Sequence, residues 1–384
     1  MTPAFSDAEL ERLLERPVRV LLTPADRASC AGRHILITGA GGSVGSELAR
    51  QIAACGPATL TLVDQSELNL FHIERELAVS APEVAVDAVM ADITRSTPMR
   101  QVFDAAQPDV VYHAAAYKHV TMVERAVCPA AMVNVLGTMV VADLARETGA
   151  RFVLISSDKA ASPRSVMGAT KRMAELLVLS RANSRFRPIV VRFGNVLGSS
   201  GSVLTLMRDQ IRRGQPLTIT DPDATRYFMT AGEAVSLVMK ADLLATRAET
   251  YWLDMGDPVR IGALADRLLA LEEECGYAAV PAHIIGLRAG EKLREELTTQ
   301  GLRMCRTKHR RIWVARQRPI DRASSELALR KLRRAVAAGD ALRALTVIAA
   351  AVHEFDISQE AWASARRLSP AGRPRGANRA LRVA

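Results

Sequence analysis

The segment ILITGAGGSVGSELARQI, residues 35–52, constrains the fold of this chain more than any other. An apolar run typical of a buried strand is followed directly by Gly39, Gly42 and Gly45, and then by a helical pattern. Glycines at this spacing let backbone amides at a helix start face a pyrophosphate. A tight strand-to-helix turn without a ligand is the alternative. The predicted cofactor contacts here are Gly39, Gly42, Ser43, Val44 and Gly45.

Strand-like and helix-like segments alternate after this turn. Helical patterns at 44–55 and 67–79 separate apolar runs that read as strands. This alternation predicts an α/β fold of the Rossmann type, with a doubly wound parallel sheet covered on both faces. The predicted strands are 34–38, 59–64, 86–92, 108–115, 151–157 and 188–193.

The chain of 384 residues is long enough for two domains or one enlarged domain. Residues 1–31 read as an N-terminal arm with one short amphipathic helix, and 32–193 as the NAD(P)-binding Rossmann domain. After residue 193 the strand and helix patterns no longer alternate regularly. We therefore expect 194–360 to be a smaller substrate-binding region, partly interleaved with the first domain. Residues 361–384 are expected to form a basic disordered tail.

The formal net charge of +10 does not by itself indicate a nucleic-acid-binding protein. Much of the excess lies in the tail, where 366–382 carries six Arg and no acidic residue. Because aromatic residues and nucleic-acid motifs are lacking, a solvated tail is the main interpretation. Contact with anionic lipid or an acidic partner is the alternative.

Apolar runs and cysteines point to a cytoplasmic protein. The runs are shorter than the roughly 20 residues of a membrane span, and no leader pattern opens the sequence. The five cysteines are scattered, without close pairs or nearby histidines. We therefore expect free thiols in a reducing compartment, no metal and no transmembrane segment.

Polar residues after the second and third strands predict further cofactor contacts. Asp64 ends the second strand, where a carboxylate accepts hydrogen bonds from ribose hydroxyls and repels a 2′-phosphate, which favours NAD over NADP. A nearby cation such as Arg75 leaves NADP open. Asp92 is placed either at the adenine amine or at a helix N-cap. The remaining predicted contacts are Ile93, Ala114 and Ala115.

The string SSDKAASPRSVMGATK, residues 156–171, is where the chemistry is expected. It follows a buried-strand pattern and puts Asp158 and Lys159 beside a helix that carries Met167 and Lys171. Residues four apart share a helix face, but the thioether of Met167 exchanges no proton at neutral pH. The neighbouring Asp158 and Lys159 must therefore carry more of the proton transfer; a surface ion pair is the competing interpretation.

Taken together, these motifs resemble the CapD-like polysaccharide-biosynthesis proteins, UDP-N-acetylglucosamine 4,6-dehydratases among the extended short-chain dehydrogenase/reductases. The resemblance spans about 32–313 and rests on seven segments: TGAGGSVGSEL, LVDQSE, HAAAYKHV, SSDKAASPRSVMGATKR, RFGNVLGSSGSV, TRYFMT and GLRAGEKLREEL. Many relatives carry transmembrane helices ahead of this region.

The resemblance implies a reaction and roles for residues. NAD takes hydride from sugar C4, water leaves from C5 and C6, and hydride returns to C6. Lys159 is the implied base for C5, Asp158 the acid for the C6 hydroxyl, and Ser157 a hydrogen-bond partner of the 4-hydroxyl. Lysine acts as a base if burial and a cation such as Lys171 lower its pKa, and aspartate acts as an acid if burial raises its pKa.

Within this family one branch has Tyr at the position of Met167 and another has Met, and this chain matches the Met branch. Loss of activity is the alternative meaning of Met167. Lys171 is implied to hold the nicotinamide ribose.

Substrate contacts are expected from four other motifs. Tyr117, Lys118 and His119 follow the fourth strand at the pocket rim, although a lone His is more often structural. Asn195 lies in a glycine-containing loop suited to a diphosphate, and Arg226 is a planar cation suited to phosphate. By resemblance Arg288 also reaches the pyrophosphate, while Glu291 is read as a solvated helix start.

The resemblance thus implies a nucleotide-sugar 4,6-dehydratase acting on UDP-N-acetylglucosamine or a related UDP-N-acetylhexosamine in polysaccharide biosynthesis. A 4-epimerase on the same sugars shares fold and cofactor. A catalytically silent nucleotide-sugar-binding protein is a second alternative, and a nucleic-acid-binding module is a distant third. Because relatives associate through helices, a homo-oligomer is expected.

Overall fold

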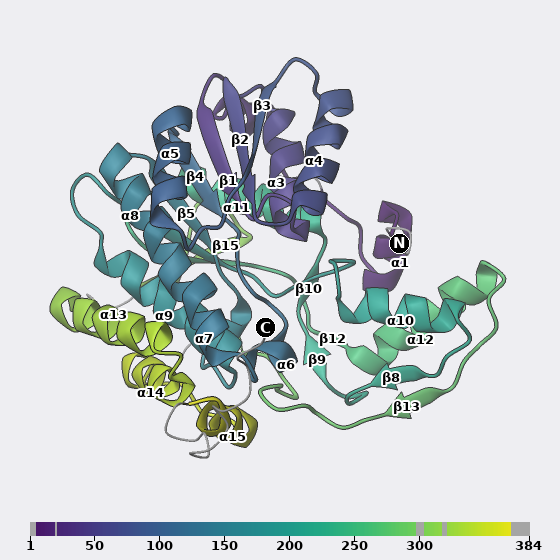
Figure 1. Ribbon diagram of the computed structural model, residues 1–384. Helices are drawn as coiled ribbons and strands as arrows, with labels where there is room; N and C mark the ends of the chain where they lie inside the picture. The colour runs from purple at the N-terminus through teal and green to yellow at the C-terminus, as the bar shows by residue number, and fades with distance from the viewer. Residues whose placement is uncertain (1–4, 20, 297–302, 317–320, 370–384) are drawn as a thin grey trace, which may run out of the picture.

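A large sheet forms the centre of the protein. The computed structural model describes residues 5–19, 21–296, 303–316 and 321–369. Within these ranges nine strands pair in the order β14-β15-β11-β6-β5-β4-β1-β2-β3 (Figure 1). The parallel strands are β1 (His34–Thr38), β2 (Thr59–Asp64), β3 (Ala85–Met90), β4 (Val110–His113), β5 (Arg151–Ile155), β6 (Ile189–Arg192) and β11 (Thr250–Leu253). Antiparallel β15 (Ile312–Arg316) and β14 (Arg303–Arg306) complete one edge.

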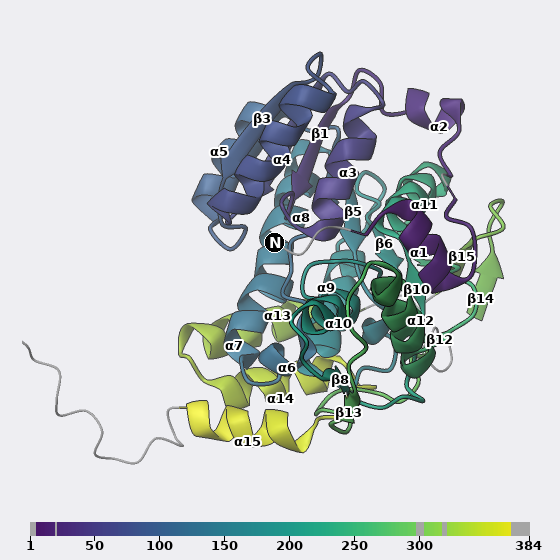
Figure 2. The same ribbon diagram turned by 90° about the vertical axis from the view of Figure 1, so that its right-hand side faces the viewer.

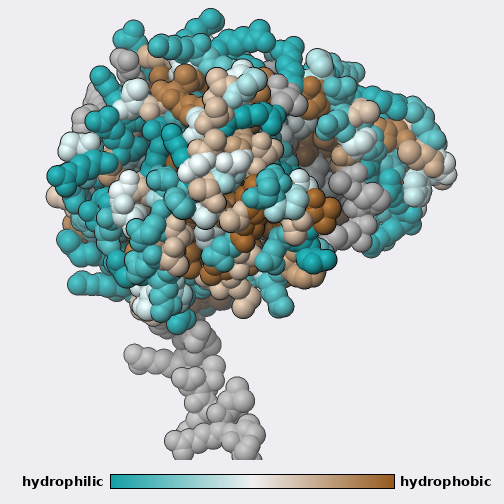
Figure 3. Space-filling model, turned by 90° about the horizontal axis from the view of Figure 1, so that it is seen from above, coloured by the Kyte–Doolittle hydropathy of each residue, from teal (hydrophilic) through white to brown (hydrophobic). Residues whose placement is uncertain are grey.

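Two apolar layers cover the sheet, because successive side chains of a strand point to opposite faces. Ile35 and Ile37 belong to one layer and Leu36 to the other. The first layer includes α3 (Ser43–Ala53), α4 (Glu67–Ser80) and α11 (Ala231–Leu244); the second includes α5 (Ser96–Ala106), α8 (Thr138–Thr148) and α9 (Val166–Ser180). The predicted doubly wound fold is confirmed. Seen from above, the surface is mostly hydrophilic with separate hydrophobic patches (Figure 3).

The strand order reverses beside β1, since β2 lies on one side of it and β4 on the other. Ligands of open α/β sheets bind at the carboxyl ends of strands at such a switch point. His113, which ends β4, is buried between the hydroxyls of Thr38 and Thr138, at 2.7 and 2.9 Å. Burial lowers its pKa to about 3, so a neutral imidazole ties the two strand ends together.

One helical stretch, Val127–Thr148, is long and apolar enough to cross a membrane, contrary to the expectation from the shorter apolar runs. It consists of α7 (Val127–Ala130), the π-helix η1 (Ala131–Gly137) and α8. Of its most apolar window, 67% is buried inside the protein. The stretch packs in the second apolar layer, which accounts for its composition.

A smaller lobe lies to one side of the sheet (Figure 1). Its core joins α10 (Val203–Arg212) and α12 (Ile261–Glu274) to the N-terminal helix α1 (Asp7–Leu14). Short pairs of strands complete it: β8 (Leu217–Ile219) with β13 (Ala282–Ile284), β9 (Thr225–Arg226) with β12 (Val259–Arg260), and β7 (Asn195–Val196) with β10 (Phe228–Met229).

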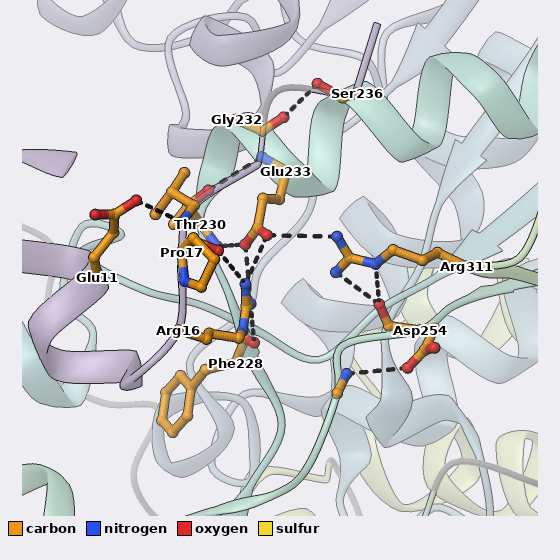
Figure 4. Close-up of polar contacts among 12 residues, drawn as sticks. Glu11, Arg16, Pro17, Phe228, Thr230, Gly232, Glu233, Ser236, Asp254 and Arg311 are labelled. Carbon is orange, nitrogen blue, oxygen red and sulfur yellow. Dashed lines mark hydrogen bonds and ion pairs between the residues drawn. The ribbon is translucent and has the colours of Figure 1, made fainter. Parts of the chain in front are cut away.

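The N-terminal segment is anchored to the body. The predicted α1 is confirmed, and a second helix that was not predicted, α2 (Pro24–Ala28), begins at a capping box of Thr23 and Asp26. After α1, Arg16 pairs at 2.7 Å with Glu233, a fully buried carboxylate that also faces Arg311 at 3.5 Å (Figure 4). Because a buried carboxylate needs such partners, this contact holds the segment on α11.

The C-terminal helices pack on the second face of the sheet, beside α9 and α7 (Figures 1 and 2). They are α13 (Arg322–Ala337), α14 (Ala341–Ala351) and α15 (Gln359–Leu368). The prediction of a disordered tail from 361 onward is wrong for 361–368, because Ala361 and Ala365 are fully buried there. Residues 370–384 lie outside the described ranges. The expected region 194–360 is thus divided among the side lobe, the sheet edge and this helical layer.

The remaining helices are short. They are α6 (Val120–Val123) and the 3-10 turn η2 (Asp158–Ala160), which lies at the end of β5.

Candidate active site

The glycine-rich turn connects β1 to α3 with its backbone exposed toward the switch point. Gly39 has φ of +69°, and a methyl group on it would lie 2.6 Å from the nitrogen of Ala115. A methyl on Gly45 would lie 2.0 Å from the carbonyl oxygen of Gly39, so only glycine lets α3 start this close to the strand. Gly42 caps α3 without a side-chain bond. The first amides of α3 therefore suit a pyrophosphate.

Asp64 lies at the end of β2 and fixes this turn. One carboxylate oxygen accepts the Gly41 amide at 2.9 Å, and the other accepts the Ser66 amide at 2.9 Å. The side chain is half-buried. Asp64 thus stands beside the glycine-rich turn, where its unused lone pairs suit a ribose hydroxyl.

A cavity of about 150 Å³ opens at the ends of β1, β2 and β4. Six predicted cofactor residues line it: Gly39, Gly42, Asp64, Ile93, Ala114 and Ala115. The other predicted contacts, Ser43, Val44, Gly45, Asp92 and Lys171, are not part of its wall. Sequence reasoning missed Gln65, Asn69 and Ala91 and placed Tyr117 only at the rim. The glycines of the turn and the three alanines 114–116 leave room beside the first amides of α3, where the adenosine and pyrophosphate end of a dinucleotide would fit.

Asp92 does not cap a helix. Its carboxylate accepts the Thr94 amide at 2.8 Å, whereas α5 starts after Arg95 as N-cap. The N-cap alternative is wrong because the chain makes a further turn before α5. The contact of Asp92 with adenine stays a prediction.

The loop after β7 closes over the glycine-rich turn. The Ser200 amide donates to the Ser43 hydroxyl at 3.0 Å, and Lys118 donates to the Ser200 carbonyl at 2.6 Å. His119 lies against Gly201, where an added methyl would be 2.6 Å from the ring. The structure therefore brings Lys118, His119 and the loop after β7 together at one side of the site.

Asp158, Ser157 and Lys159 form the short turn η2 directly after β5. Asp158 is 1% exposed, and its Oδ1 accepts from the Ser157 hydroxyl at 2.9 Å and from Lys159 Nζ at 3.1 Å. Among the residues the structure describes, Oδ2 has no hydrogen-bond partner although it is buried. A surface ion pair is excluded by this burial. A buried carboxylate oxygen without a partner in the protein is a position where an ordered water or a bound ligand donates.

Lys159 is charged in this arrangement. Its Nζ also donates to the Asn195 side-chain oxygen at 3.0 Å and lies 3.5 Å from Glu295. Burial opposes the ammonium form, but the charges of Asp158 and Glu295 prevail and raise the pKa of Lys159 above its usual value. The condition for Lys159 to act as a base, a pKa lowered by burial and a neighbouring cation, is therefore not met in the free protein. Sequence reasoning missed Glu295, which comes from a distant loop.

The helix α9 carries Met167 and Lys171 on its buried surface, as predicted. Lys171 Nζ donates to the Ile155 carbonyl at 3.0 Å, and burial lowers the pKa of Lys171 to about 8, against an opposing effect of Glu175. A methyl on Gly168 would lie 2.2 Å from the Lys159 carbonyl. This glycine lets α9 approach η2, which sets Met167 and Lys171 beside the Asp158–Lys159 turn.

Behind this turn, a buried ion pair fixes the end of β5. Glu175 accepts from Arg192 Nε at 2.6 Å, from the Ser156 hydroxyl at 2.5 Å and from Arg172 at 3.2 Å. The side chains of Glu175 and Arg192 are 0% exposed. Their pairing compensates the cost of burying both charges and joins α9 to β5 and β6.

Asn134 is another residue that the sequence interpretation missed. It lies in the π-helix, accepts the Tyr117 amide at 2.8 Å and donates to the Tyr117 carbonyl and to Thr170, each at 3.1 Å. A π-helix within a longer helix often marks a functional site. Here it orients the chain after β4 toward α9.

Arg226 and Arg288 take different positions. Arg226 is buried, with Nη1 bound to the Thr225 carbonyl at 2.8 Å and Nε 3.6 Å from Glu295. Arg288 is exposed, and its amide donates to Glu291 at 3.1 Å. Glu291 therefore closes a turn, and the expected helix start is wrong. The diphosphate contacts of both arginines stay predictions.

Among the described residues there is no group of three or more His, Cys, Asp or Glu side chains that could hold a metal. The five cysteines are free thiols.

Comparison with known proteins gives a family and several relatives. Residues 35–317 match the sequence profile of a family described as polysaccharide biosynthesis protein. The capsular polysaccharide biosynthesis protein CapD of Staphylococcus aureus is 43% identical over 298 residues, covering 75% of this chain and 49% of CapD. The chain thus spans about half the length of that relative.

Two relatives with named reactions are equally similar. The UDP-N-acetylglucosamine 4,6-dehydratase (inverting) of Campylobacter jejuni is 30% identical, over 69% of this chain and 77% of that protein. The UDP-glucose 4-epimerase of Rickettsia canadensis is also 30% identical, over 70% of this chain and 78% of that protein.

Solved structures share the fold. Pen from Bacillus thuringiensis has a TM-score of 0.68 at 28% identity, covering 76% of this chain and 92% of Pen. DesIV from Streptomyces venezuelae, a dTDP-glucose 4,6-dehydratase solved with NAD bound, has a TM-score of 0.59 at 21% identity, covering 69% and 88%. At this identity DesIV supports the fold alone.

Proposed function

Because the chain belongs to the polysaccharide biosynthesis protein family, we propose that it is a nucleotide-sugar 4,6-dehydratase. The proposed substrate is UDP-N-acetylglucosamine or a related UDP-N-acetylhexosamine. The proposed product is the corresponding UDP-4-keto-6-deoxy sugar for polysaccharide biosynthesis. Membership of the family and the relative from Campylobacter jejuni support this choice.

The observation that carries the proposal is the buried Asp158–Lys159 pair at the end of β5. Elimination of water needs one group to remove the C5 proton and another to protonate the C6 hydroxyl. The pair supplies both from adjacent residues, and Asp158 has a buried oxygen free among the described residues to meet a hydroxyl. Met167 beside it cannot take part in proton transfer.

The proton must first move within the pair. In the free protein Lys159 is the ammonium, whereas its role at C5 requires the amine. The hydrogen bond of 3.1 Å from Nζ to Oδ1 gives a direct path for one proton to pass to Asp158. When a sugar expels water from the site, the neutral pair is favoured over the charged one. Lys159 then accepts the C5 proton, and Asp158 donates its proton to the departing C6 hydroxyl, which leaves as water. When hydride returns to C6, Lys159 gives a proton back to C5. The proton of the 4-hydroxyl leaves to solvent as C4 is oxidised, and a proton from solvent restores the pair at the end of the cycle.

The cofactor proposed for this site is NAD, which supplies the acceptance of hydride from C4 and its return to C6. Gly39, Gly42 and the first amides of α3 would hold its pyrophosphate, and Asp64 its adenosine ribose. Lys171 would hold the nicotinamide ribose, and Ser157 would orient the 4-hydroxyl.

Replacing Asp64 with Ala is expected to weaken NAD binding by about tenfold, the effect of roughly 1.4 kcal/mol from one lost hydrogen bond to a charged group. NADP binding should fall less, because the carboxylate that repels the 2′-phosphate is gone. Calorimetric titration of both cofactors measures the ratio. The exposed Glu74, on α4, gives the matched control Glu74→Ala. An unchanged NAD to NADP ratio would place the ribose contact elsewhere.

A 4-epimerase is the second candidate, because the epimerase of Rickettsia canadensis is as similar as the dehydratase. Mass spectrometry separates the two. Incubation of the protein with UDP-N-acetylglucosamine and NAD is expected to yield a product lighter by one water. An isomer of unchanged mass would identify an epimerase.

Cytoplasmic location and a homo-oligomer remain proposals.

A further inference from the structure

Glu295 places a carboxylate between the proposed catalytic lysine and the proposed diphosphate-binding arginine. Its Oε1 lies 3.5 Å from Lys159 Nζ and 3.6 Å from Arg226 Nε. The Glu295 side chain is only 4% exposed. A buried carboxylate at this depth depends on the two cations for its stability.

Backbone pairing fixes this position. Residues 293–294 run alongside β9: the Thr225 amide donates to the Leu293 carbonyl at 2.9 Å, and Thr225 forms a parallel bridge with Arg294. Arg226 Nη1 also reaches the Leu293 carbonyl at 3.3 Å. The loop that carries Glu295 is therefore held beside Arg226 by main-chain hydrogen bonds.

The charges form an alternating chain. Asp158 from η2, Lys159, Glu295 from the loop and Arg226 from β9 follow one another at 3.1, 3.5 and 3.6 Å. Asn195 from β7 faces Lys159 as a neutral acceptor. Two carboxylates balance two cations, so removing Glu295 leaves the chain with an excess positive charge at Lys159 and Arg226.

We propose that Glu295 is a positioning residue that holds Lys159 as an ammonium and links it to Arg226. The role of Glu295 in turnover rests on the proposed function, whereas its contacts with Lys159 and Arg226 do not depend on that function.

The test measures Lys159 directly. Competitive acetylation with acetic anhydride across pH, read by peptide mass spectrometry, gives the pH at which Lys159 becomes reactive; its side chain is 20% exposed. Glu295→Gln removes the charge of the side chain and keeps its shape. In this variant the pH midpoint of Lys159 acetylation is expected to fall by about one pH unit or more. Glu295→Asp should restore most of the midpoint. The matched control is Glu296→Gln, since Glu296 is 52% exposed and lies 3.8 Å from Lys292; it should leave the midpoint unchanged.

A second readout is the pH dependence of kcat/KM for dehydration. Because the reaction needs the amine form of Lys159, a lower pKa in Glu295→Gln moves the rising limb to lower pH. An unchanged acetylation midpoint in folded Glu295→Gln, or an Asp variant that behaves like the Gln variant, would overturn the proposal. A shifted midpoint without dehydration in any variant, wild type included, would support the Glu295 contact and reject the dehydratase.

Discussion

Lys159→Ala is expected to lower the rate of dehydration by at least about 100-fold, the usual contribution of a general acid or base. The amine that would take the C5 proton is removed, and no neighbouring group replaces it, because Asp158 is assigned to the C6 hydroxyl and Met167 has no exchangeable proton. Asp158→Asn should have a comparable effect, since an amide neither accepts the lysine proton nor donates it to the hydroxyl. Rates are measured from product formation by mass spectrometry.

Cofactor binding separates loss of chemistry from loss of structure. Both variants should still bind NAD, since neither residue lines the cavity at the glycine-rich turn. Lys331→Ala, at an exposed position on α13, is the matched control and should keep full activity. Near-normal turnover in Lys159→Ala or Asp158→Asn would refute the assigned proton transfers.

Glu175→Ala is expected to lower the free energy of unfolding by about 3–5 kcal/mol, because it leaves the buried charge of Arg192 without its carboxylate. Arg192 Nε lies 2.6 Å from Glu175, and both side chains are completely buried. Ser156 also loses its acceptor at 2.5 Å. The change is measured by urea-induced unfolding followed by circular dichroism.

The exposed residue Glu74 supplies the control for this experiment as well. Glu74→Ala is expected to change the free energy of unfolding by less than about 0.5 kcal/mol, as surface substitutions do. A Glu175→Ala protein as stable as this control would show that the buried pair does not hold β5, β6 and α9 together.

Short-range sequence patterns predicted the strands and helices whose position depends on neighbouring residues in the chain. The apolar runs and glycine spacing between 34 and 192 predicted the parallel strands and the first helices within a few residues, because burial on both faces leaves a continuous apolar signal. The same reasoning found Asp158 and Lys159, since they follow a core strand. The capping box at Thr23 was a readable signal for α2 that was not used.

Contacts between residues far apart in the chain leave no short-range pattern in the sequence. Glu295 is 136 residues from Lys159 along the chain, and its role depends on the pairing of 293–294 with β9. The burial of Ala361, Ser364 and Ala365 on α15 depends on a surface formed by other helices, so composition alone suggested a solvated tail. The charge of Lys159 could not be predicted for the same reason, because the raised pKa depends on Glu295 as well as on Asp158.

The central claim is the internal transfer of hydride from C4 to C6 with loss of water, and substrate deuterated at C4 tests it directly. UDP-N-acetylglucosamine with deuterium at C4 is incubated with the protein and NAD, and the product is examined by mass spectrometry and NMR. The account predicts loss of one water and a C6 methyl group that carries one deuterium. A product of unchanged mass with deuterium still at C4 would contradict it and identify a 4-epimerase.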